Sequence, residues 1–325
     1  MKRVLGRSGI EISALGLGCW AIGGPFWSGE TPNGWGEVDD AESIRAIHIA
    51  LDSGITFFDT ANVYGAGHSE KILGKAVGSR RADVVIATKF SAVFDEETRQ
   101  VLREDATPSG IRSALEDSLR RLNTDYIDLY QFHNNGFPAS EAGTVRDTLE
   151  ALVAEGKIRT YGWSTDFSDR AAVFAQGKNC TAIQLQLNVL DDNPELIQLC
   201  EQEDLAAINR GPLAMGVLTK KYASTTEVPI DDVRGKNSPD WMGYFKHGRP
   251  NQTFLDMRDS IVEILTSDGR TLAQGALAWL WGRSSKTIPI PGFRTERQVL
   301  ENVAAMTFGP LSNDQMNEID QLLNR

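Results

Sequence analysis

Short hydrophobic runs alternate along the chain with longer segments whose apolar residues recur every three or four positions. The short runs are rich in β-branched and aromatic residues, which is typical of buried strands, whereas the longer segments have the spacing of amphipathic helices. We expect strands at residues 14–18, 55–59, 84–89, 127–131, 158–163, 182–187, 205–209 and 286–289. Helices are expected at residues 39–53, 69–77, 107–122, 142–154, 169–175, 194–202 and 271–282, and a further one is expected to begin at Thr295. This alternation predicts an α/β protein of the (β/α)8 type, a TIM barrel.

Three consecutive predicted strands end in chemically active side chains. Asp59 ends one strand, Lys89 ends the next, and His133 follows the third. Tyr64 lies shortly beyond Asp59, before a break in the chain at Gly65. Because all strands of a (β/α)8 barrel point the same way, these four side chains could meet at one rim. A carboxylate at the end of a buried strand is costly unless it is paired, and Lys89 is the candidate partner for Asp59.

Together these four residues suit a proton-transfer site. A tyrosine with an ordinary pKa of about 10 donates a proton near neutral pH only if a nearby positive charge stabilises its phenolate. Lys89 can supply that charge, and Asp59 would keep the lysine protonated. His133 is then free to orient a substrate oxygen. Each residue alone has an ordinary structural interpretation, as a cap, a half-buried aromatic, a surface lysine or a loop histidine, so the prediction depends on their combination.

Composition limits the kinds of partner. The chain has 325 residues, and 33 Lys and Arg against 44 Asp and Glu give a net charge of −11 and a pI near 5.0. An acidic chain argues against a nucleic-acid or anionic-membrane surface. The three cysteines are far apart and match neither a disulfide framework nor a metal site. The amino terminus lacks the apolar stretch of a signal peptide, and no run reaches the roughly 18 apolar residues that span a bilayer. A cytoplasmic protein is predicted.

Two stretches are longer and more irregular than barrel turns require. Residues 23–39 are rich in Gly, Pro and Trp, and residues 220–250 form a long polar insertion. Both follow predicted strands, so both are expected over the carboxyl-terminal rim, where insertions commonly shape a binding site. A mobile surface excursion is the alternative interpretation. Because the eight strands and their helices form one uninterrupted barrel pattern, the chain is predicted to form a single domain over residues 1–325.

Several strings resemble the aldo-keto reductase superfamily, and the resemblance covers nearly the whole chain. They include GITFFDTANVYGAGHSE, VVIATK and DLYQFH. LGRSGIEISALGLGCW resembles the family's amino-terminal β-hairpin and first strand, and IPIPGFRTERQVLEN resembles its cofactor-closing segment. The resemblance implies an NADP(H)-dependent oxidoreductase that acts on the carbonyl or alcohol carbon of an aldehyde, ketone or sugar. It also implies that Tyr64 is the general acid in reduction and the general base in oxidation, assisted by Asp59, Lys89 and His133.

The resemblance further implies that a nicotinamide cofactor lies across the barrel mouth. A GxGxxG motif after the first strand, which a Rossmann site would require, is absent. By this resemblance, Ser164 and Gln184 hold the carboxamide, the loop at residues 211–216 straps the pyrophosphate, and Arg294 meets a phosphate. The complete set of expected cofactor contacts is Gly18, Cys19, Trp20, Asp59, Ser164, Thr165, Gln184, Arg210, Gly211, Pro212, Leu213, Ala214, Met215, Gly216, Lys221, Gly292, Phe293, Arg294, Gln298, Glu301 and Asn302.

Two positions depart from the family pattern. Arg210 stands where many relatives carry an aromatic residue that stacks on nicotinamide, although a planar guanidinium can also stack. Where many relatives read Ser-Asn, this chain reads Ser164-Thr165-Asp166. Arg294 favours NADP(H), since a guanidinium suits a 2′-phosphate, and use of NAD(H) stays open.

The substrate pocket is expected to include Trp20, Trp27, Tyr64 and His133, with further aromatic residues on the two long loops, but the small-molecule substrate is not named by the sequence. One alternative is a regulatory cofactor-binding protein similar to potassium-channel β subunits, which carry Asn in place of His133. Another is a barrel lyase in which Lys89 forms a Schiff base. The oligomeric state and the direction of the reaction are left open.

Overall fold

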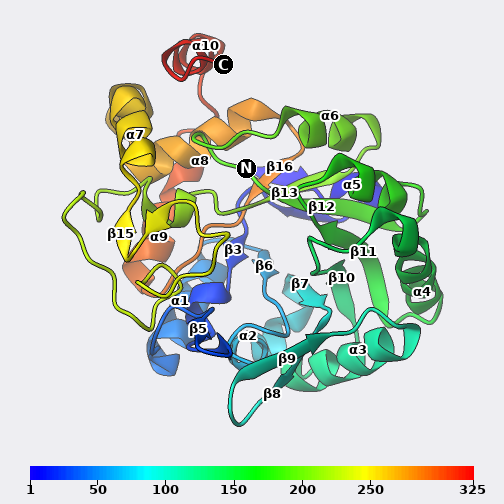
Figure 1. The fold of residues 1–325 in the computed structure, drawn as a ribbon. Helices are drawn as coiled ribbons and strands as arrows, with labels where there is room; N and C mark the ends of the chain where they lie inside the picture. Colours follow the sequence, from blue (N-terminus) through cyan, green and yellow to red (C-terminus); the bar gives the residue numbers. More distant parts are fainter.

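Eight parallel strands form a ring with helices around it (Figure 1). A computed structural model describes residues 1–325. The strands lie in the order β16-β13-β12-β11-β10-β7-β6-β3, with bounds β3 (Leu17–Gly18), β6 (Phe57–Asp59), β7 (Val85–Phe90), β10 (Ile127–Phe132), β11 (Ile158–Ser164), β12 (Cys180–Gln186), β13 (Ala206–Arg210) and β16 (Thr287–Pro289). β3 meets the segment after β16 through a parallel bridge between Gly18 and Gly292. The predicted (β/α)8 barrel is confirmed.

Helices surround the ring, and the seven predicted ones are confirmed with ends that differ by at most one residue. The structure has α1 (Asp40–Asp52), α2 (His68–Val77), α3 (Pro108–Leu122), α4 (Ala142–Ala154), α5 (Ser168–Ala175), α6 (Pro194–Gln202), α7 (Gln252–Leu265), α8 (Leu272–Arg283), α9 (Glu296–Ala304) and α10 (Asn313–Leu322). Local capping explains the accuracy. The Thr107 side chain accepts a hydrogen bond from the Gly110 amide, and Pro108 is the first residue of α3. Thr271 and Gln274 form a capping box at the start of α8. Thr295 is the N-cap of α9, as expected.

The largest differences from the sequence prediction concern three elements. The first strand is shorter than predicted, because the Ala14 amide donates to the Met1 carbonyl and the indole N–H of Trp281 donates to the Ala14 carbonyl. The backbone at residue 14 is therefore used outside the barrel sheet. Helices α7 and α10 were not predicted; α7 directly follows the long insertion, and α10 is the last helix of the chain.

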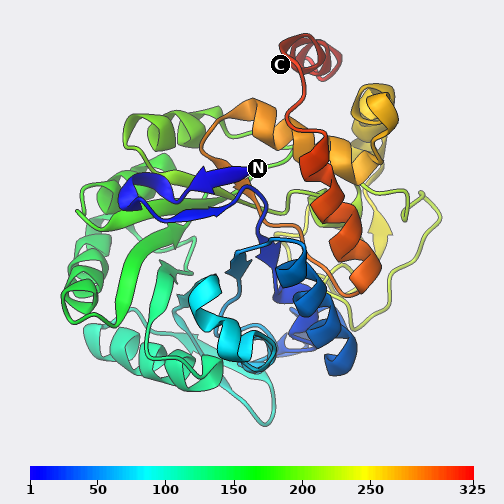
Figure 2. The same ribbon diagram turned by 180° about the vertical axis from the view of Figure 1, so that it is seen from behind.

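Alternation along the strands divides the apolar residues into an inner and an outer set. The inner set includes Phe57, Ala87, Leu129 and Ile208 and fills the barrel, whereas a cluster of 68 buried residues lies between the strands and the helices. A hairpin of β1 (Lys2–Val4) and β2 (Glu11–Ser13) lies across the amino-terminal end of the barrel, as predicted (Figure 2). The interior is thus a packed core, and only the carboxyl-terminal rim is available for chemistry.

The long loops gather over this rim (Figure 1). Residues 23–39 contribute β4 (Trp27–Ser28) and β5 (Thr31–Pro32), which join a hairpin of β8 (Ala92–Asp95) and β9 (Gln100–Glu104) in a four-stranded sheet. The 220–250 insertion contains β14 (Phe245–Lys246) and ends at β15 (Arg249–Pro250). A bridge between Trp35 and Asp232 and a bond from the Val233 amide to the Gly34 carbonyl (2.7 Å) join the two loops. The expected position of both loops is confirmed.

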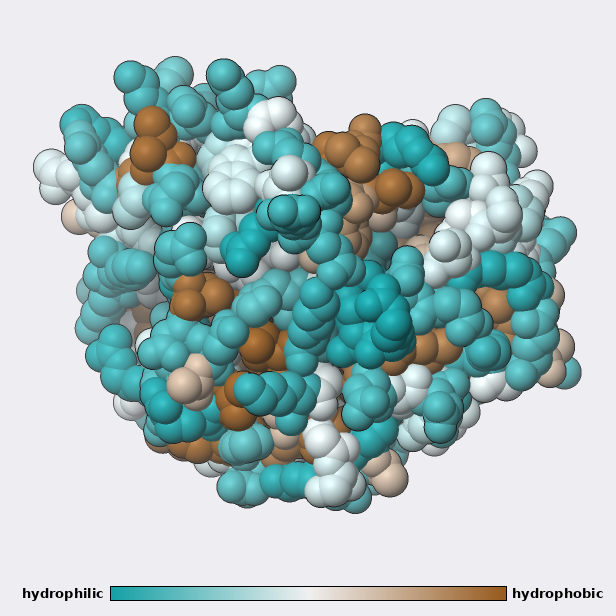
Figure 3. Space-filling view, turned by 90° about the horizontal axis from the view of Figure 1, so that it is seen from below, coloured by the Kyte–Doolittle hydropathy of each residue, from teal (hydrophilic) through white to brown (hydrophobic).

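The face seen from below in Figure 3 is mainly hydrophilic, with hydrophobic side chains in separate small patches. This agrees with the acidic composition of the chain. No helix combines the length and the apolar character that crossing a membrane would need.

Candidate active site

A buried ion pair lies at the centre of the carboxyl-terminal rim. Lys89, at 0% exposure, donates from Nζ to Asp59 Oδ1 at 2.5 Å and to the Thr60 carbonyl at 2.8 Å. The two residues lie at the ends of the adjacent strands β7 and β6, two positions beyond the inward-facing Ala87 and Phe57, so both point into the barrel. Burial by itself would lower the pKa of Lys89, but Asp59 and the hydrogen bonds to Asp59 and Tyr64 raise it. The lysine is therefore a fixed cation.

Tyr64 approaches this cation from the turn after β6. Its hydroxyl oxygen lies 3.4 Å from Lys89 Nζ. Gly65, with a φ of 62°, makes the turn possible, because a Cβ there would lie 1.8 Å from the Gly23 carbonyl oxygen. Burial raises the pKa of Tyr64, and the attraction of Lys89 opposes this rise without cancelling it. The tyrosine is thus a neutral phenol with a cation ready to stabilise its phenolate.

His133 completes the group of four residues predicted from strand ends. It follows β10, its amide donates to the Phe90 carbonyl at 2.9 Å, and its ring lies 5.9 Å from the Tyr64 ring at 88°. No protein group hydrogen-bonds to the imidazole. Burial, then the positive charges of Lys89 and Arg210, lower its pKa well below the ordinary value. A neutral imidazole without a protein partner is available to a substrate oxygen.

Two amide side chains hold the other oxygen of Asp59. Gln184 Nε2 donates to Asp59 Oδ2 at 2.8 Å, and Gln131 Nε2 donates to the same atom at 3.0 Å. Gln184 was predicted as a cofactor contact, and the structure places it deep in the rim beside the ion pair. Gln131 was not singled out, although it lies two residues before His133 and shares its inward direction. Both amides therefore fix the carboxylate that charges Lys89.

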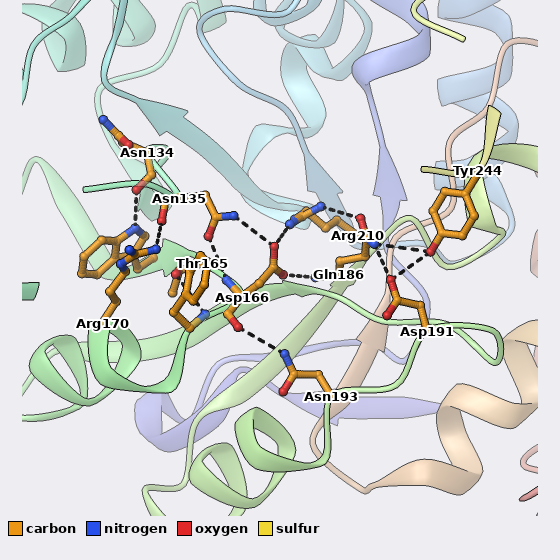
Figure 4. Close-up of polar contacts among 12 residues, drawn as sticks. Asn134, Asn135, Thr165, Asp166, Arg170, Gln186, Asp191, Asn193, Arg210 and Tyr244 are labelled. Carbon is orange, nitrogen blue, oxygen red and sulfur yellow. Dashed lines mark hydrogen bonds and ion pairs between the residues drawn. The ribbon is translucent and has the colours of Figure 1, made fainter. Parts of the chain in front are cut away.

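A second ion pair lies further round the rim, between the end of β13 and the segment that follows β11 (Figure 4). Arg210, at the end of β13, donates to Asp166 Oδ2 and to Gln186 Oε1, the latter at 3.1 Å. Two further hydrogen bonds fix Asp166. Its Oδ1 accepts one from the backbone amide of Gln186 at 2.7 Å, and its Oδ2 accepts one from Asn135 Nδ2 at 3.2 Å. The Arg210 and Asp166 side chains are 33% and 27% exposed. Gln186 Nε2 also donates to Asp191, which accepts from the Tyr244 hydroxyl, so the network continues into the insertion.

Aromatic rings form one wall of the site. Trp20 stacks on Tyr64 with ring centroids 5.7 Å apart, meets Trp35 edge-on at 5.3 Å and lies 6.2 Å from Trp241. Trp27 lies away from this set, in β4 of the small sheet, where it pairs with β9. From the sequence, Trp20 and Trp27 were expected in the pocket, with Trp35 and either Trp241 or Tyr244 as further aromatic residues on the two long loops. The structure places Trp35 and Trp241 against Trp20, because the two loops cross above the rim.

The expected cofactor positions lie along one side of the same rim. Ser164 and Thr165 are buried at the end of β11, and Cys19 is buried after β3, where burial raises its pKa. Residues 211–216 form a tight turn with left-handed backbone at Gly211, Ala214, Met215 and Gly216. Lys221 is exposed beyond this turn, in contact with the Tyr222 ring.

The closing segment lies against the 23–39 loop. Arg294 donates to the carbonyls of Trp35, at 2.9 Å, and Glu37, and its amide donates to Gln298 Oε1 at 2.8 Å. The remaining positions expected here are Gly292, Phe293, Glu301 and Asn302, of which Phe293 and Asn302 are buried. The predicted catalytic four therefore come together, and the predicted cofactor residues spread from that centre to the start of α9.

Comparison with known proteins agrees with this geometry. The model of the Aldo/keto reductase family matches residues 14–324. The aldo-keto reductase YhdN of Bacillus subtilis is 31% identical, with 97% of this chain and 91% of that protein covered. The solved glycerol dehydrogenase of Gluconobacter oxydans is 31% identical, with a TM-score of 0.79 and coverage of 97% of this chain and 93% of that one.

A Klebsiella pneumoniae aldo-keto reductase, solved in complex with NADPH, is 26% identical, with a TM-score of 0.71 and coverage of 99% of this chain and 95% of that one. The family match spans nearly the whole chain and includes every strand of the barrel. By its sequence, its barrel and the match to the family model, this chain belongs to the aldo/keto reductase family.

Proposed function

We propose that this protein is an NADP(H)-dependent oxidoreductase that interconverts the carbonyl and alcohol forms of an aldehyde, ketone or sugar. The observation that carries the proposal is the position of Lys89 Nζ between Asp59, at 2.5 Å, and the Tyr64 hydroxyl, at 3.4 Å. This arrangement links a proton donor to a fixed cation in a buried site. A purely structural ion pair would not need a tyrosine hydroxyl within reach of the lysine.

A bound nicotinamide would supply or accept the hydride. In reduction, the Tyr64 hydroxyl gives its proton to the carbonyl oxygen as the hydride reaches the carbonyl carbon. Lys89 stabilises the phenolate that forms, and the neutral His133 imidazole donates an N–H to the same oxygen and holds it in place. In oxidation the Tyr64 phenolate removes the alcohol proton.

The chain offers suitable groups for the rest of the cofactor. Arg294 uses two of its five N–H donors on carbonyl oxygens, which leaves three for a phosphate. It lies just before the amino terminus of α9, where exposed amides attract anions. The turn at residues 211–216 directly follows β13 at the rim and has left-handed backbone at four positions, and we assign the pyrophosphate to it. We assign the nicotinamide end to the region of Ser164, Gln184 and Arg210.

Titration with NADPH and then NADH, followed by tryptophan fluorescence, tests the proposal. Trp20 and Trp35 lie at the rim, so cofactor binding should quench or shift their emission. Aldehydes, ketones and sugars are then added while the absorbance of the reduced nicotinamide is recorded. Tight NADPH binding followed by oxidation is expected. Binding without turnover on any carbonyl would favour the regulatory alternative, and failure to bind either cofactor at millimolar concentration would overturn the proposal.

Tyr64→Phe tests the assignment of the acid. The substitution removes only the hydroxyl that faces the substrate, so kcat should fall between about a hundredfold and ten-thousandfold while the Kd for NADPH stays within a factor of about two. A variant that keeps most of the wild-type rate would show that another group donates the proton. Borohydride trapping of a substrate on Lys89 would instead support the lyase alternative.

A further inference from the structure

One position where this chain departs from the family pattern, Arg210, pairs in space with Asp166, which directly follows the other, Thr165. Arg210 and Asp166 are 44 residues apart in sequence, yet Arg210 donates to Asp166 Oδ2 (Figure 4). The carboxylate also accepts from the Gln186 amide and from Asn135, and Gln186 Oε1 accepts from the arginine. Both charged groups are thus held in place by partners on neighbouring strands and loops.

Arg210 is the second cation of the site. Asp59 neutralises the first, Lys89, through a contact of 2.5 Å. Arg210 ends β13 two residues beyond the inward-facing Ile208, so it points into the rim beside that pair. Burial raises the pKa of Tyr64 and lowers that of His133; the charge of Arg210 opposes the first effect and adds to the second. Each cation at the reacting centre is therefore matched by one carboxylate.

The proposed function determines what this second pair would face. Hydride transfer requires the nicotinamide ring to contact the carbon whose oxygen lies between Tyr64 and His133. The oxidised ring carries one positive charge more than the reduced ring. An unpaired guanidinium close to that ring would bind the oxidised cofactor less tightly than the reduced one, and would so oppose the loss of hydride. A neutralised guanidinium would not discriminate in this way.

We propose that Asp166 is a positioning residue that neutralises Arg210 beside the nicotinamide and so keeps the affinities of the oxidised and reduced cofactor in balance. This inference rests on the proposed function, because it places the nicotinamide at this rim. The planar guanidinium of Arg210 offers the nicotinamide a surface to stack on from the β13 side of the site. Asp166 neutralises its positive charge, which would otherwise repel the oxidised ring. The balance of the two affinities sets the reduction potential of the bound cofactor, and a tenfold change in their ratio corresponds to about 30 mV for a two-electron couple.

Charge variants at the two positions should change the ratio of Kd for NADP⁺ to Kd for NADPH in opposite directions. Asp166→Asn leaves Arg210 uncompensated, so the ratio should rise about tenfold. Arg210→Gln leaves Asp166 uncompensated, so the ratio should fall. The double variant Asp166→Asn/Arg210→Gln removes both charges and should return the ratio to within about threefold of wild type. Arg210→Lys keeps the charge and should also stay near the wild-type ratio.

The measurement is tryptophan fluorescence titration of each variant with NADP⁺ and NADPH, with circular dichroism as a check of folding. Asp169→Asn is a matched control: it makes the same charge change three residues away on the exposed side of α5, and the ratio should not move. A general loosening of the site would weaken both cofactor forms and leave the ratio unchanged. If wild type binds both forms and the single variants shift the ratio in the same direction or not at all, the inference is overturned and the proposed function stands. If wild type binds neither form, the proposed function fails.

Discussion

The proposed proton transfer at Tyr64 depends on a competition between burial and one cation. The sequence predicted that Lys89 would stabilise the phenolate, and the structure places its Nζ 3.4 Å from the hydroxyl oxygen. Burial nevertheless has the larger effect, and it raises the pKa of Tyr64. The hydroxyl is thus protonated in the resting site, as a donor must be. In the proposed mechanism, Lys89 would act only when negative charge begins to develop on the oxygen, which is when stabilisation accelerates a reaction.

This competition predicts the pH dependence of carbonyl reduction. Because the pKa of Tyr64 is raised above its ordinary value of 10, the phenol stays protonated and kcat for reduction should be flat from pH 7 to about pH 10. Because the pKa of His133 is depressed, the imidazole should stay neutral, and no loss of rate from its protonation is expected until well below pH 6.5. Initial rates of reduction, measured at saturating NADPH across this pH range, test both the acidic and the basic side of the profile. A fall in rate with a midpoint below pH 9 would show that the phenol ionises more easily than its burial implies.

Arg294→Ala tests the predicted preference for a 2′-phosphate. A charge-assisted hydrogen bond contributes about 1.5–3 kcal/mol, so the variant should bind NADPH roughly ten- to a hundredfold more weakly. NADH lacks the phosphate, and its Kd should change by less than about threefold. Arg297→Ala, at an exposed position on the next turn of α9, is the matched control and should change neither value. Equal losses for both cofactors in Arg294→Ala would mean that the arginine holds the 23–39 loop without contacting the phosphate.

At the scale of elements, one buried arginine fastens the 220–250 insertion to the rim. Arg234, at 6% exposure, forms a two-pronged ion pair with Asp232, at 2.8 and 2.6 Å. It also donates to the Met215 carbonyl at 3.0 Å, and its guanidinium lies 4.3 Å from the Trp35 ring centroid. The insertion, the 211–216 turn and the 23–39 loop therefore meet at a single side chain. The sequence showed only a polar segment here, because these partners lie in separate loops.

Arg234→Met should loosen this junction. Removal of one partner from a buried ion pair leaves Asp232 uncompensated, which typically costs about 3–5 kcal/mol. Because the pair lies in a loop, we expect faster hydrogen exchange and faster proteolysis within residues 220–250. The barrel strands should keep their protection against exchange. Arg249→Ala, which removes an exposed ion pair with Glu227 in the same insertion, should cost no more than about 1 kcal/mol. Unchanged exchange in Arg234→Met would show that backbone pairing alone holds the insertion.

At the scale of the whole molecule, the barrel separates stability from chemistry along its axis. Apolar residues fill the interior and the hairpin of β1 and β2 lies across one end, whereas the polar inward-facing residues gather at the other end. The inward-facing positions of a single strand supply both the apolar filling and the polar rim, since Phe57 and Asp59 lie two positions apart on β6. The core therefore supports the ion pair from below without taking part in the reaction.

Phe57→Ala measures how much one interior side chain supports the fold. Phe57 is 0% exposed in the cluster that fills the barrel, so its truncation should lower the free energy of unfolding by about 3–5 kcal/mol. Urea denaturation should show a lower midpoint with an unchanged slope. Leu102→Ala, on the exposed face of β9 at 63% exposure, should stay within about 0.5 kcal/mol of wild type. A loss below 1 kcal/mol in Phe57→Ala would mean that the interior collapses around the gap.

The sequence by itself determined the alternation of the barrel strands and helices, the ends of the predicted helices and the inward direction of Asp59, Lys89 and His133. These features are local: strand and helix periods are encoded over a few residues, and caps such as Thr107 act within one turn. Sequence could not show that Asp59 is held by Gln131 as well as by Gln184, because strand pairing brings those amides together.

Only the tertiary structure decided which loop residues meet above the rim. Arg210 pairs with Asp166, Arg294 bonds to the Trp35 carbonyl, and Trp241 joins Trp20 across a long insertion. Irregular loops have no repeating period from which a path can be read, so their contacts follow from packing against the finished barrel. That the four strand-end side chains meet could therefore be predicted from the sequence, whereas the second ion pair and the Arg234 junction required the assembled fold.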